Sequence, residues 1–158
     1  MDKRLVLEAV IAALRAELEG YARSARSAQA EATDEQSKAE NKYDTRGLEA
    51  SYLARGQSRQ AAETAQSLQL LQALTADARS TVADVGALVE VEHAGEVQLY
   101  FMGPAGGGTE VMVEGRAVIV ITPQSPLGQQ LAGKRAGARI ALPGRGKKAK
   151  AYRIVSVG

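Results

Sequence analysis

The feature that most constrains this chain is a heptad pattern of apolar residues near its start. The pattern consists of Leu7, Ile11, Leu14, Leu18, Tyr21, Ala25, Ala28 and Ala32. The spacings alternate between four and three residues, which is typical of a helix that packs along another helix. Large side chains occupy the first half of this seam and alanines the second half. The spacing predicts a helix of about 30 residues, which would be about 45 Å long.

A second helical pattern follows after a polar interval. Its apolar residues are Leu48, Tyr52, Leu53, Ala54, Ala61, Ala65, Leu68, Leu71 and Leu74. Here Ala54, Ala61 and Ala65 precede Leu68, Leu71 and Leu74, so the bulky ends of the two helices coincide only if the helices run antiparallel. The size gradient therefore favours a helical hairpin. The alternative is a parallel homodimer of one long helix; Gly47, Gly56 and the polar interval argue against it.

The polar interval between the helices, residues 31–44, is rich in acids. It holds five carboxylates and two lysines. In a hairpin this stretch is the tip of a rod, and a narrow rod can carry acids into a pore that a globular domain cannot enter. The plain alternative is a solvated turn, because charge clusters on helical ends are ordinarily solvated.

The second half of the chain changes to short strand patterns. Apolar or alternating runs cover residues 87–92, 97–102, 110–114, 117–121, 139–142 and 152–157. Residues 125–133 read as a short helix, with Ser125 as N-cap, Pro126 at the first position and Gly133 as the stop. We predict an α+β chain, with an antiparallel coiled-coil hairpin over 1–82, its acidic tip at about 33–44, and a small β-rich domain over 83–158.

Composition narrows the functional classes. The 158 residues contain no Cys, which excludes disulfides, thiolate nucleophiles and Cys-ligated metals. No apolar run approaches the roughly 18 residues of a membrane span, and the basic start reads as a helix start and not as a signal peptide. We expect a cytoplasmic protein without membrane contact, and a monomer. Residues 1–83 carry 11 basic and 12 acidic side chains (net −1), and residues 84–158 carry 9 and 6 (net +3). The basic excess favours an acidic partner or nucleic acid.

The remaining motifs give weaker indications of function. Gly103–Gly108 lacks the Lys-Ser/Thr of a phosphate loop and reads as a plain loop. The single histidine, His93, has no second His and no Cys to complete a metal or triad site. The segment from Arg145 to Lys150 is a basic turn that either contacts nucleic acid or is solvated. No pairing of nucleophile and base is visible, so we expect no catalysis by the chain alone.

Two motifs resemble the bacterial Gre transcript-cleavage and elongation factors (GreA/GreB), and the resemblance spans nearly the whole chain. Ser125-Pro126-Leu127-Gly128, continued by Leu131-Ala-Gly133-Lys134 and Gly137, is similar to the family's Ser-Pro…Leu-x-Gly-Lys…Gly signature, with Ala138 where the family has Asp. Glu40-Asn41-Lys42-Tyr43-Asp44 resembles the family's Glu-Asn-Ala-Glu-Tyr tip, and Tyr52 stands for its later aromatic residue.

The resemblance implies a fold, a partner and a mode of action. It implies an FKBP-like C-terminal domain and a coiled coil that enters the secondary channel of RNA polymerase. Two tip acids would hold a second Mg²⁺ so that the polymerase's own site cleaves backtracked RNA; the chain needs no cofactor of its own. The candidate tip acids are Asp34, Glu35, Glu40 and Asp44, and of these Glu35 and Glu40 would bind the metal in the complex. Arg23 and Arg26 would contact nascent RNA. The residues that would bind the polymerase are Ser125, Pro126, Leu127, Gly128 and Lys134.

The tip differs from the family pattern in its register. Aligned without gaps on Tyr43, the family's tip Asp falls on Gln36 and its Glu on Ala39, with Glu35 and Glu40 one residue away. In a helix, a shift of one residue turns a side chain by about 100°. Two functions stay open for a channel-binding factor: stimulation of cleavage, and regulation of initiation or pausing without cleavage. Outside this class, the implied fold suggests a prolyl isomerase or chaperone, and the heptads suggest a self-associating scaffold.

Overall fold

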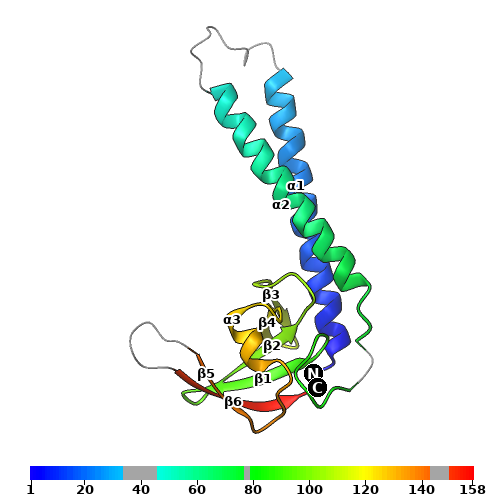
Figure 1. The fold of residues 1–158 in the computed structure, drawn as a ribbon. Coiled ribbons are helices and arrows are strands. Elements are labelled where there is room, and N and C mark those ends of the chain that lie inside the picture. Colours follow the sequence, from blue (N-terminus) through cyan, green and yellow to red (C-terminus); the bar gives the residue numbers. More distant parts are fainter. Residues whose placement is uncertain (34–45, 77–78, 143–149) are drawn as a thin grey trace. The chain divides into compact units, whose positions relative to one another are not determined.

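The computed structural model describes residues 1–33, 46–76, 79–142 and 150–158, and over these ranges it has the predicted α+β architecture (Figure 1). Two long helices are followed by four strands, a short helix and two further strands. The elements are α1 (Lys3–Thr33), α2 (Arg46–Gln72), β1 (Leu88–His93), β2 (Glu96–Met102), β3 (Glu110–Val113), β4 (Arg116–Ile121), α3 (Pro126–Leu131), β5 (Arg139–Leu142) and β6 (Lys150–Val157).

The chain divides into two compact units. One unit consists of Leu14–Gln66, which holds most of α1 and α2. The other consists of Met1–Ala13 together with Ser67–Gly158, so it contains the start of α1, the end of α2 and all strands. The sheet unit therefore takes in helical residues that lie before position 83. The predicted division of domains at residue 82 stays a prediction.

The first helix begins at a cap and is buried along only part of its predicted seam. The backbone N–H of Arg4 donates to Asp2 Oδ1 at 2.9 Å, which satisfies a donor of the first turn. Leu7 and Leu14 are buried as predicted, but Ala25 and Ala28 are exposed. A methyl group offers little apolar area to bury, so the alanine part of the seam gains little from packing.

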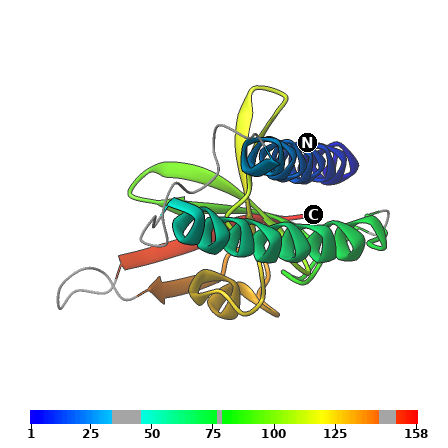
Figure 2. The same cartoon turned by 90° about the horizontal axis from the view of Figure 1, so that it is seen from above.

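The strands form one mixed sheet with the order β3-β4-β2-β1-β6-β5. The neighbours β2 and β4 run parallel, and every other pair is antiparallel. A register shift between Glu90 and Val91 interrupts the pairing of β1 with β6, and such a bulge bends the strand. In Figure 2 the short helix α3 lies beside β5.

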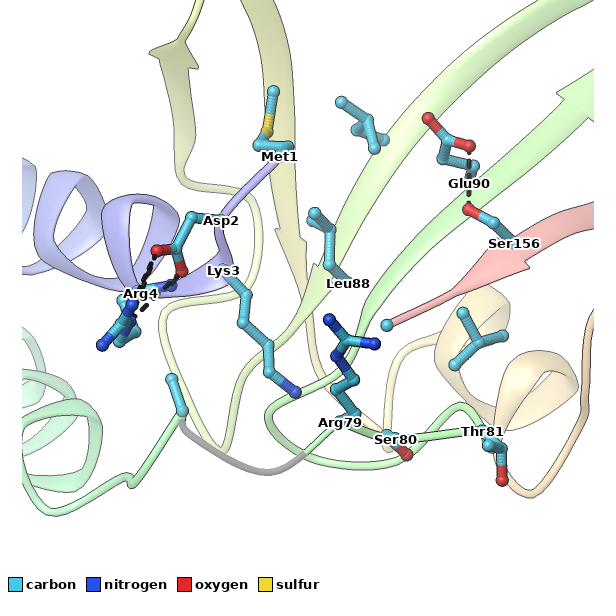
Figure 3. A pocket seen from close by; sticks show the side chains of 14 residues that line it. Met1, Asp2, Lys3, Arg4, Arg79, Ser80, Thr81, Leu88, Glu90 and Ser156 are labelled. Atoms are coloured by element: carbon cyan, nitrogen blue, oxygen red, sulfur yellow. Dashed lines mark hydrogen bonds and ion pairs between the residues drawn. The ribbon is translucent and has the colours of Figure 1, made fainter.

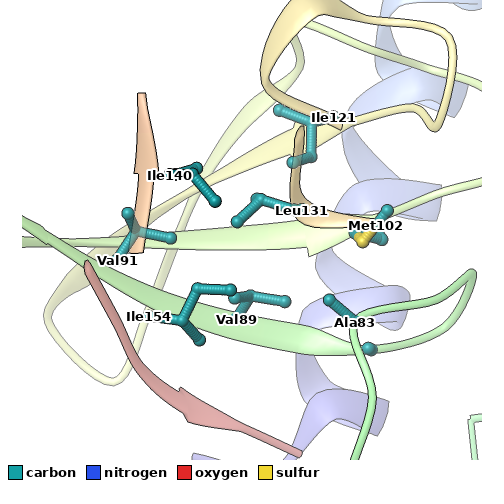
Figure 4. Close-up of a cluster of buried hydrophobic side chains, with 9 residues drawn as sticks. Ala83, Val89, Val91, Met102, Ile121, Leu131, Ile140 and Ile154 are labelled. Atoms are coloured by element: carbon teal, nitrogen blue, oxygen red, sulfur yellow. The ribbon is translucent and has the colours of Figure 1, made fainter. Parts of the chain in front are cut away.

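One face of the sheet carries a core that α3 closes (Figure 4). This core cluster consists of Ala83, Ala87, Val89, Val91, Met102, Ile121, Leu131, Ile140 and Ile154. The alternation along β1 explains its membership, because residues two apart on a strand point to the same face. Leu131 of α3 is fully buried among these strand residues.

The opposite face is apolar in the middle of the sheet. Leu99, Phe101, Val118 and Val120 on β2 and β4 are buried there. Val6, Val10 and Leu71, from the helical parts of the same unit, are also fully buried. Burial of side chains of this size contributes about 1.5–3 kcal/mol each. The two apolar faces explain why the central strands lack the simple apolar–polar alternation of a half-exposed sheet.

Within the ranges that the structure describes, none of the helices combines the length and the apolar character that spanning a bilayer requires.

Candidate functional site

The tip of the hairpin, where the sequence predicts the acidic site, lies between the described ends of α1 and α2. The chain leaves α1 at Thr33 and enters α2 at Arg46. The predicted tip acids Asp34, Glu35, Glu40 and Asp44, including the predicted metal ligands Glu35 and Glu40, lie outside the described residues. Of the predicted acidic stretch, Glu31 is described, and it is exposed on the last turns of α1. The roles of the tip acids stay predictions.

A polar contact joins the two helices of the hairpin below the tip. Thr64 of α2, whose exposed fraction is 8%, donates from Oγ1 to Oε1 of Glu17 on α1 at 3.2 Å. The hydroxyl of Tyr21 donates to the same oxygen at 2.9 Å. This hydrogen bond to Glu17 raises the pKa of Tyr21 above its usual value, because the phenol is favoured in its neutral form. The heptad pattern does not reveal this contact, although Thr64 has seam spacing between Ala61 and Leu68.

The predicted RNA contacts, Arg23 and Arg26, are exposed on α1 above this contact. Arg23 Nη1 lies 3.9 Å from Glu19 Oε2, which is a loose ion pair of two exposed side chains. A shallow groove of about 540 Å³ runs beside Arg23 and is lined also by Ser24 and Ser27. The hydroxyls and the guanidinium suit phosphate oxygens chemically, whereas the carboxylate of Glu31, which also lines the groove, repels them. RNA contact at this surface stays a prediction.

The signature around α3 is built into the fold. Ser125 caps α3: its Oγ accepts from Gly128 N at 3.0 Å and donates to the carbonyl of Thr122 at 2.8 Å. Gly128 is buried, and an added Cβ would lie 1.9 Å from that same carbonyl oxygen. Ser125 and Gly128 therefore face inward, where they fix the entry into α3. Pro126 is exposed and Leu127 is half-buried against the core cluster.

The end of the signature attaches α3 to the segment before β1. The backbone N–H of Ala83 donates to the carbonyl of Lys134 at 2.7 Å, and Gly133 N donates back to Ala83 O at 2.8 Å. Gly133 has a φ of 75°, a conformation that glycine adopts without strain. The side chain of Lys134 is exposed. Of the predicted polymerase contacts, Pro126, Leu127 and Lys134 are accessible to a partner. Binding at these positions stays a prediction.

The sheet unit contains a cavity of about 850 Å³ that sequence analysis did not indicate (Figure 3). The start of α1, residues 79–81 and the ends of β1 and β6 line it. Two basic side chains, Lys3 and Arg79, are among the residues that line it (Figure 3). The lining mixes positive and negative groups, and Arg4 pairs with Asp2 at 3.1 Å. The cavity therefore has no single charge sign with which to select a ligand, and it contains none of the predicted site residues.

Glu90, at the wall of this cavity, provides a pH-dependent contribution to stability. Its carboxylate accepts from Ser156 Oγ and from Arg116 Nη1, both at 2.8 Å. The hydrogen bond from Ser156 and, to a smaller extent, that from Arg116 hold the pKa of Glu90 below its usual value. A carboxyl whose pKa is lowered in the folded state stabilises the fold above its unfolded pKa of about 4.3, and this stabilisation disappears as the pH falls through the folded value.

We expect Glu90→Gln to lower the free energy of unfolding by about 1 kcal/mol at neutral pH and to lessen the loss of stability between about pH 5 and about pH 3. Urea unfolding at several pH values measures both effects. Glu110→Gln, at an exposed position on β3, is the matched control and should leave the curve unchanged. An identical pH dependence for Glu90→Gln and the parent would contradict the role of this carboxylate.

Two aromatic residues of the sheet unit, Tyr100 and Tyr152, pack against the core cluster. The rings of His93 and Tyr152 stack with centroids 4.3 Å apart, and His93 Nδ1 lies 2.7 Å from the carbonyl oxygen of Ala151. Burial raises the pKa of Tyr100, and Tyr152 adds to the effect. Among the described positions, no three His, Asp or Glu side chains are grouped as metal ligands. His93, at the end of β1, is thus held by this stacking contact with Tyr152.

The comparisons with known proteins found solved structures only. Gfh1 of Thermus aquaticus is 21% identical, with a TM-score of 0.40, over 95% of this chain and 94% of that chain. GreA factor homolog 1 (Gfh1) of Thermus thermophilus is 21% identical, with a TM-score of 0.37, over 95% of each chain. The prokaryotic transcription elongation factor GreA/GreB from Nitrosomonas europaea is 22% identical, with a TM-score of 0.38, over 73% of this chain and 93% of that chain.

No protein-family model and no curated protein matches the chain.

Proposed function

We propose that this chain is a transcription factor of the Gre type that binds RNA polymerase and inserts the tip of its hairpin into the secondary channel. The observation that carries the proposal is the position of the acidic stretch between the end of α1 at Thr33 and the start of α2 at Arg46. The tip motif Glu40-Asn41-Lys42-Tyr43 and the signature around Ser125 support the same family.

A two-helix rod suits delivery into a narrow channel. A helix with its side chains is about 10–12 Å across, so two helices side by side present a tip about 20 Å wide. The stretch from Leu14 to Thr33 spans about 30 Å at 1.5 Å per residue. The residues that would enter the channel need no core of their own, and this agrees with the exposed, alanine-rich surface of α1 above Tyr21.

In the first form of the proposal, the tip acids stimulate RNA cleavage. Asp34, Glu35, Glu40 and Asp44 are the candidates, and carboxylate oxygens are the ligands that Mg²⁺ prefers. A second Mg²⁺ at the polymerase site would stabilise the attacking and leaving oxygens together. The hydrolysis belongs to the polymerase, so the chain is not itself an enzyme. Arg23 and Arg26 would contact the displaced RNA.

The second form is a factor that occupies the channel without stimulating cleavage. It is favoured by Gln36 and Ala39, which stand where the family's two acids fall in an ungapped alignment on Tyr43. Neither an amide nor a methyl group supplies a charged oxygen ligand to Mg²⁺. Such a factor would act on initiation or pausing by blocking the channel.

Purified RNA polymerase held in backtracked complexes tests both forms. The parent chain should bind the polymerase, compete with another channel-binding factor and change the amount of transcript. In the first form it also accelerates cleavage of the RNA 3′ end, and the double variant Glu35→Ala/Glu40→Ala loses this acceleration while it still binds. In the second form neither protein accelerates cleavage. Absence of binding to the polymerase by the folded parent chain would refute the proposal in both forms.

Two assays address the other classes. A peptide isomerisation assay tests for a prolyl isomerase, and sedimentation over a range of concentrations tests for a self-associating scaffold. For the proposed factor we expect no isomerisation above background and the mass of a monomer.

A further inference from the structure

We propose that Glu17, Tyr21 and Thr64 form a register lock, which fixes how far α2 is displaced along α1 and thereby positions the tip. The inference rests on the proposed function, because the position of the tip matters only if the tip acts inside a partner. It adds positioning residues that the sequence motifs do not contain.

The first part of the register lock is the buried hydroxyl of Thr64. Thr64 is the one buried polar residue among those whose burial the structure describes, with 8% of its surface exposed. A buried hydroxyl without a hydrogen-bond partner destabilises the fold. The hydroxyl of Thr64 meets this need by donating to Glu17 Oε1 at 3.2 Å, on the other helix. A displacement of the helices that breaks this contact therefore loses the hydrogen bond between Thr64 and Glu17.

Tyr21 holds the acceptor in place. It lies four residues after Glu17, so the two side chains occupy the same face of α1. Its hydroxyl donates to the same Oε1 at 2.9 Å. One carboxylate oxygen thus accepts two hydrogen bonds, one from its own helix and one from α2. The contact within α1 restricts the rotamers of Glu17 and leaves its oxygen directed toward Thr64.

The surrounding seam supplies little register information of its own. Ala61 is half-buried, and Ala25 and Ala28 are exposed. Methyl groups interlock weakly, so a shift of one turn, about 5.4 Å, would change few apolar contacts in this part. A polar residue at a single seam position is a known way to specify register in helical pairs, at some cost in stability.

The lock also sets the relative height of the two helix ends that carry the tip. From Glu17 to Thr33 there are 16 residues, or about 24 Å, and from Thr64 back to Arg46 there are 18, or about 27 Å. With the lock closed, the two ends differ in height by about 3 Å. A one-turn slip would change this offset by about 5 Å, which is large compared with the reach of a carboxylate toward a metal.

The test measures register directly in the free chain. The chain has no Cys, so Ser27→Cys on α1 and Gln60→Cys on α2 give two unique, exposed positions for spin labels. Thr64→Val removes the hydroxyl at nearly constant volume and keeps a β-branched side chain of similar helix propensity. Thr64→Ser retains the hydroxyl. Circular dichroism verifies that each variant is helical.

We expect one narrow distance distribution for the parent and for Thr64→Ser. For Thr64→Val and for Glu17→Ala we expect a distribution shifted or broadened by about 5 Å, one helical turn. Glu19→Gln, at an exposed acid of the same helix, is the control and should match the parent. A distribution for Thr64→Val that coincides with the parent's would overturn the lock.

A functional readout separates the lock from the proposed function. The affinity of Thr64→Val for RNA polymerase should be within about twofold of the parent's. Its effect on transcription should be about tenfold smaller, a difference of about 1.4 kcal/mol. Thr64→Ser should restore the effect. Normal transcription by Thr64→Val with a displaced register would overturn the positioning role. Failure of the parent to bind polymerase would refute the proposed function. The spin-label distances measured in the free chain would still test the register lock.

Discussion

We expect Gly128→Ala to lower the free energy of unfolding of the sheet unit by about 3 kcal/mol or more. A Cβ at this position would lie 1.9 Å from the carbonyl oxygen of Thr122, 2.8 Å from its carbonyl carbon and 2.9 Å from Ser125 Oγ. Two of these atoms belong to the backbone, so no side-chain rotation relieves the overlap. The turn cannot retreat without breaking the hydrogen bond from Ser125 Oγ to Thr122 O.

Urea unfolding followed by far-ultraviolet circular dichroism measures this loss. Gly56→Ala is the matched control, because Gly56 lies inside α2 and nothing comes within 4 Å of its added Cβ. Alanine in a helix interior is favoured over glycine by about 1 kcal/mol, so the control should be as stable as the parent or more stable. A Gly128→Ala variant that unfolds at the same urea concentration as the parent would show that α3 tolerates the side chain, contrary to the expected overlap.

The local part of this fold is readable from the sequence. Ser125 caps α3, Pro126 takes its first position and Gly133 follows with positive φ, as predicted. These features depend on residues a few positions apart, and short-range rules for caps and turns describe them. The strands appear within one or two residues of the predicted runs because their apolar residues alternate or cluster in short segments.

Contacts between distant residues could not be predicted in the same way. Arg116 pairs with Glu90 across the sheet, 26 positions apart, and Thr64 meets Glu17 over 47 positions. Such pairs depend on the strand order and on the axial displacement of the helices, which a single sequence does not specify. The exposed Ala25 shows the converse error, since a heptad position is buried only where packing brings a partner to it.

The candidate site, too, could be predicted from the sequence only in part. The signature around Ser125 was predicted as a polymerase-binding motif, yet Ser125 and Gly128 have clear inward roles in the fold. A motif read from sequence alone does not separate residues that shape a surface from residues that form it. Pro126 and Lys134 are exposed. Lys134 lies after the end of α3, so its substitution tests binding without changing a residue of that helix.

The register of the tip acids should determine how strongly the chain stimulates RNA cleavage. We expect the double substitution Gln36→Asp/Ala39→Glu to raise stimulation of RNA cleavage about tenfold or more over the parent. It places carboxylates at the positions where the family's acids fall when the chains are aligned on Tyr43, one residue from Glu35 and Glu40. A second Mg²⁺ contributes several kcal/mol to the transition state, and about 1.4 kcal/mol corresponds to a tenfold rate.

The comparison is made with backtracked RNA polymerase at several Mg²⁺ concentrations, because an added metal site should also lower the Mg²⁺ needed for half-maximal cleavage. The matched control is Gln36→Asn/Ala39→Gln, which alters the same positions without charge and should behave as the parent does. If the acidic variant binds the polymerase as well as the parent and cleavage does not rise, then the positions of the acids on the tip do not limit the stimulation of cleavage by this chain. The limit would then lie in how the hairpin presents its tip, which is the property that Glu17 and Thr64 are proposed to determine.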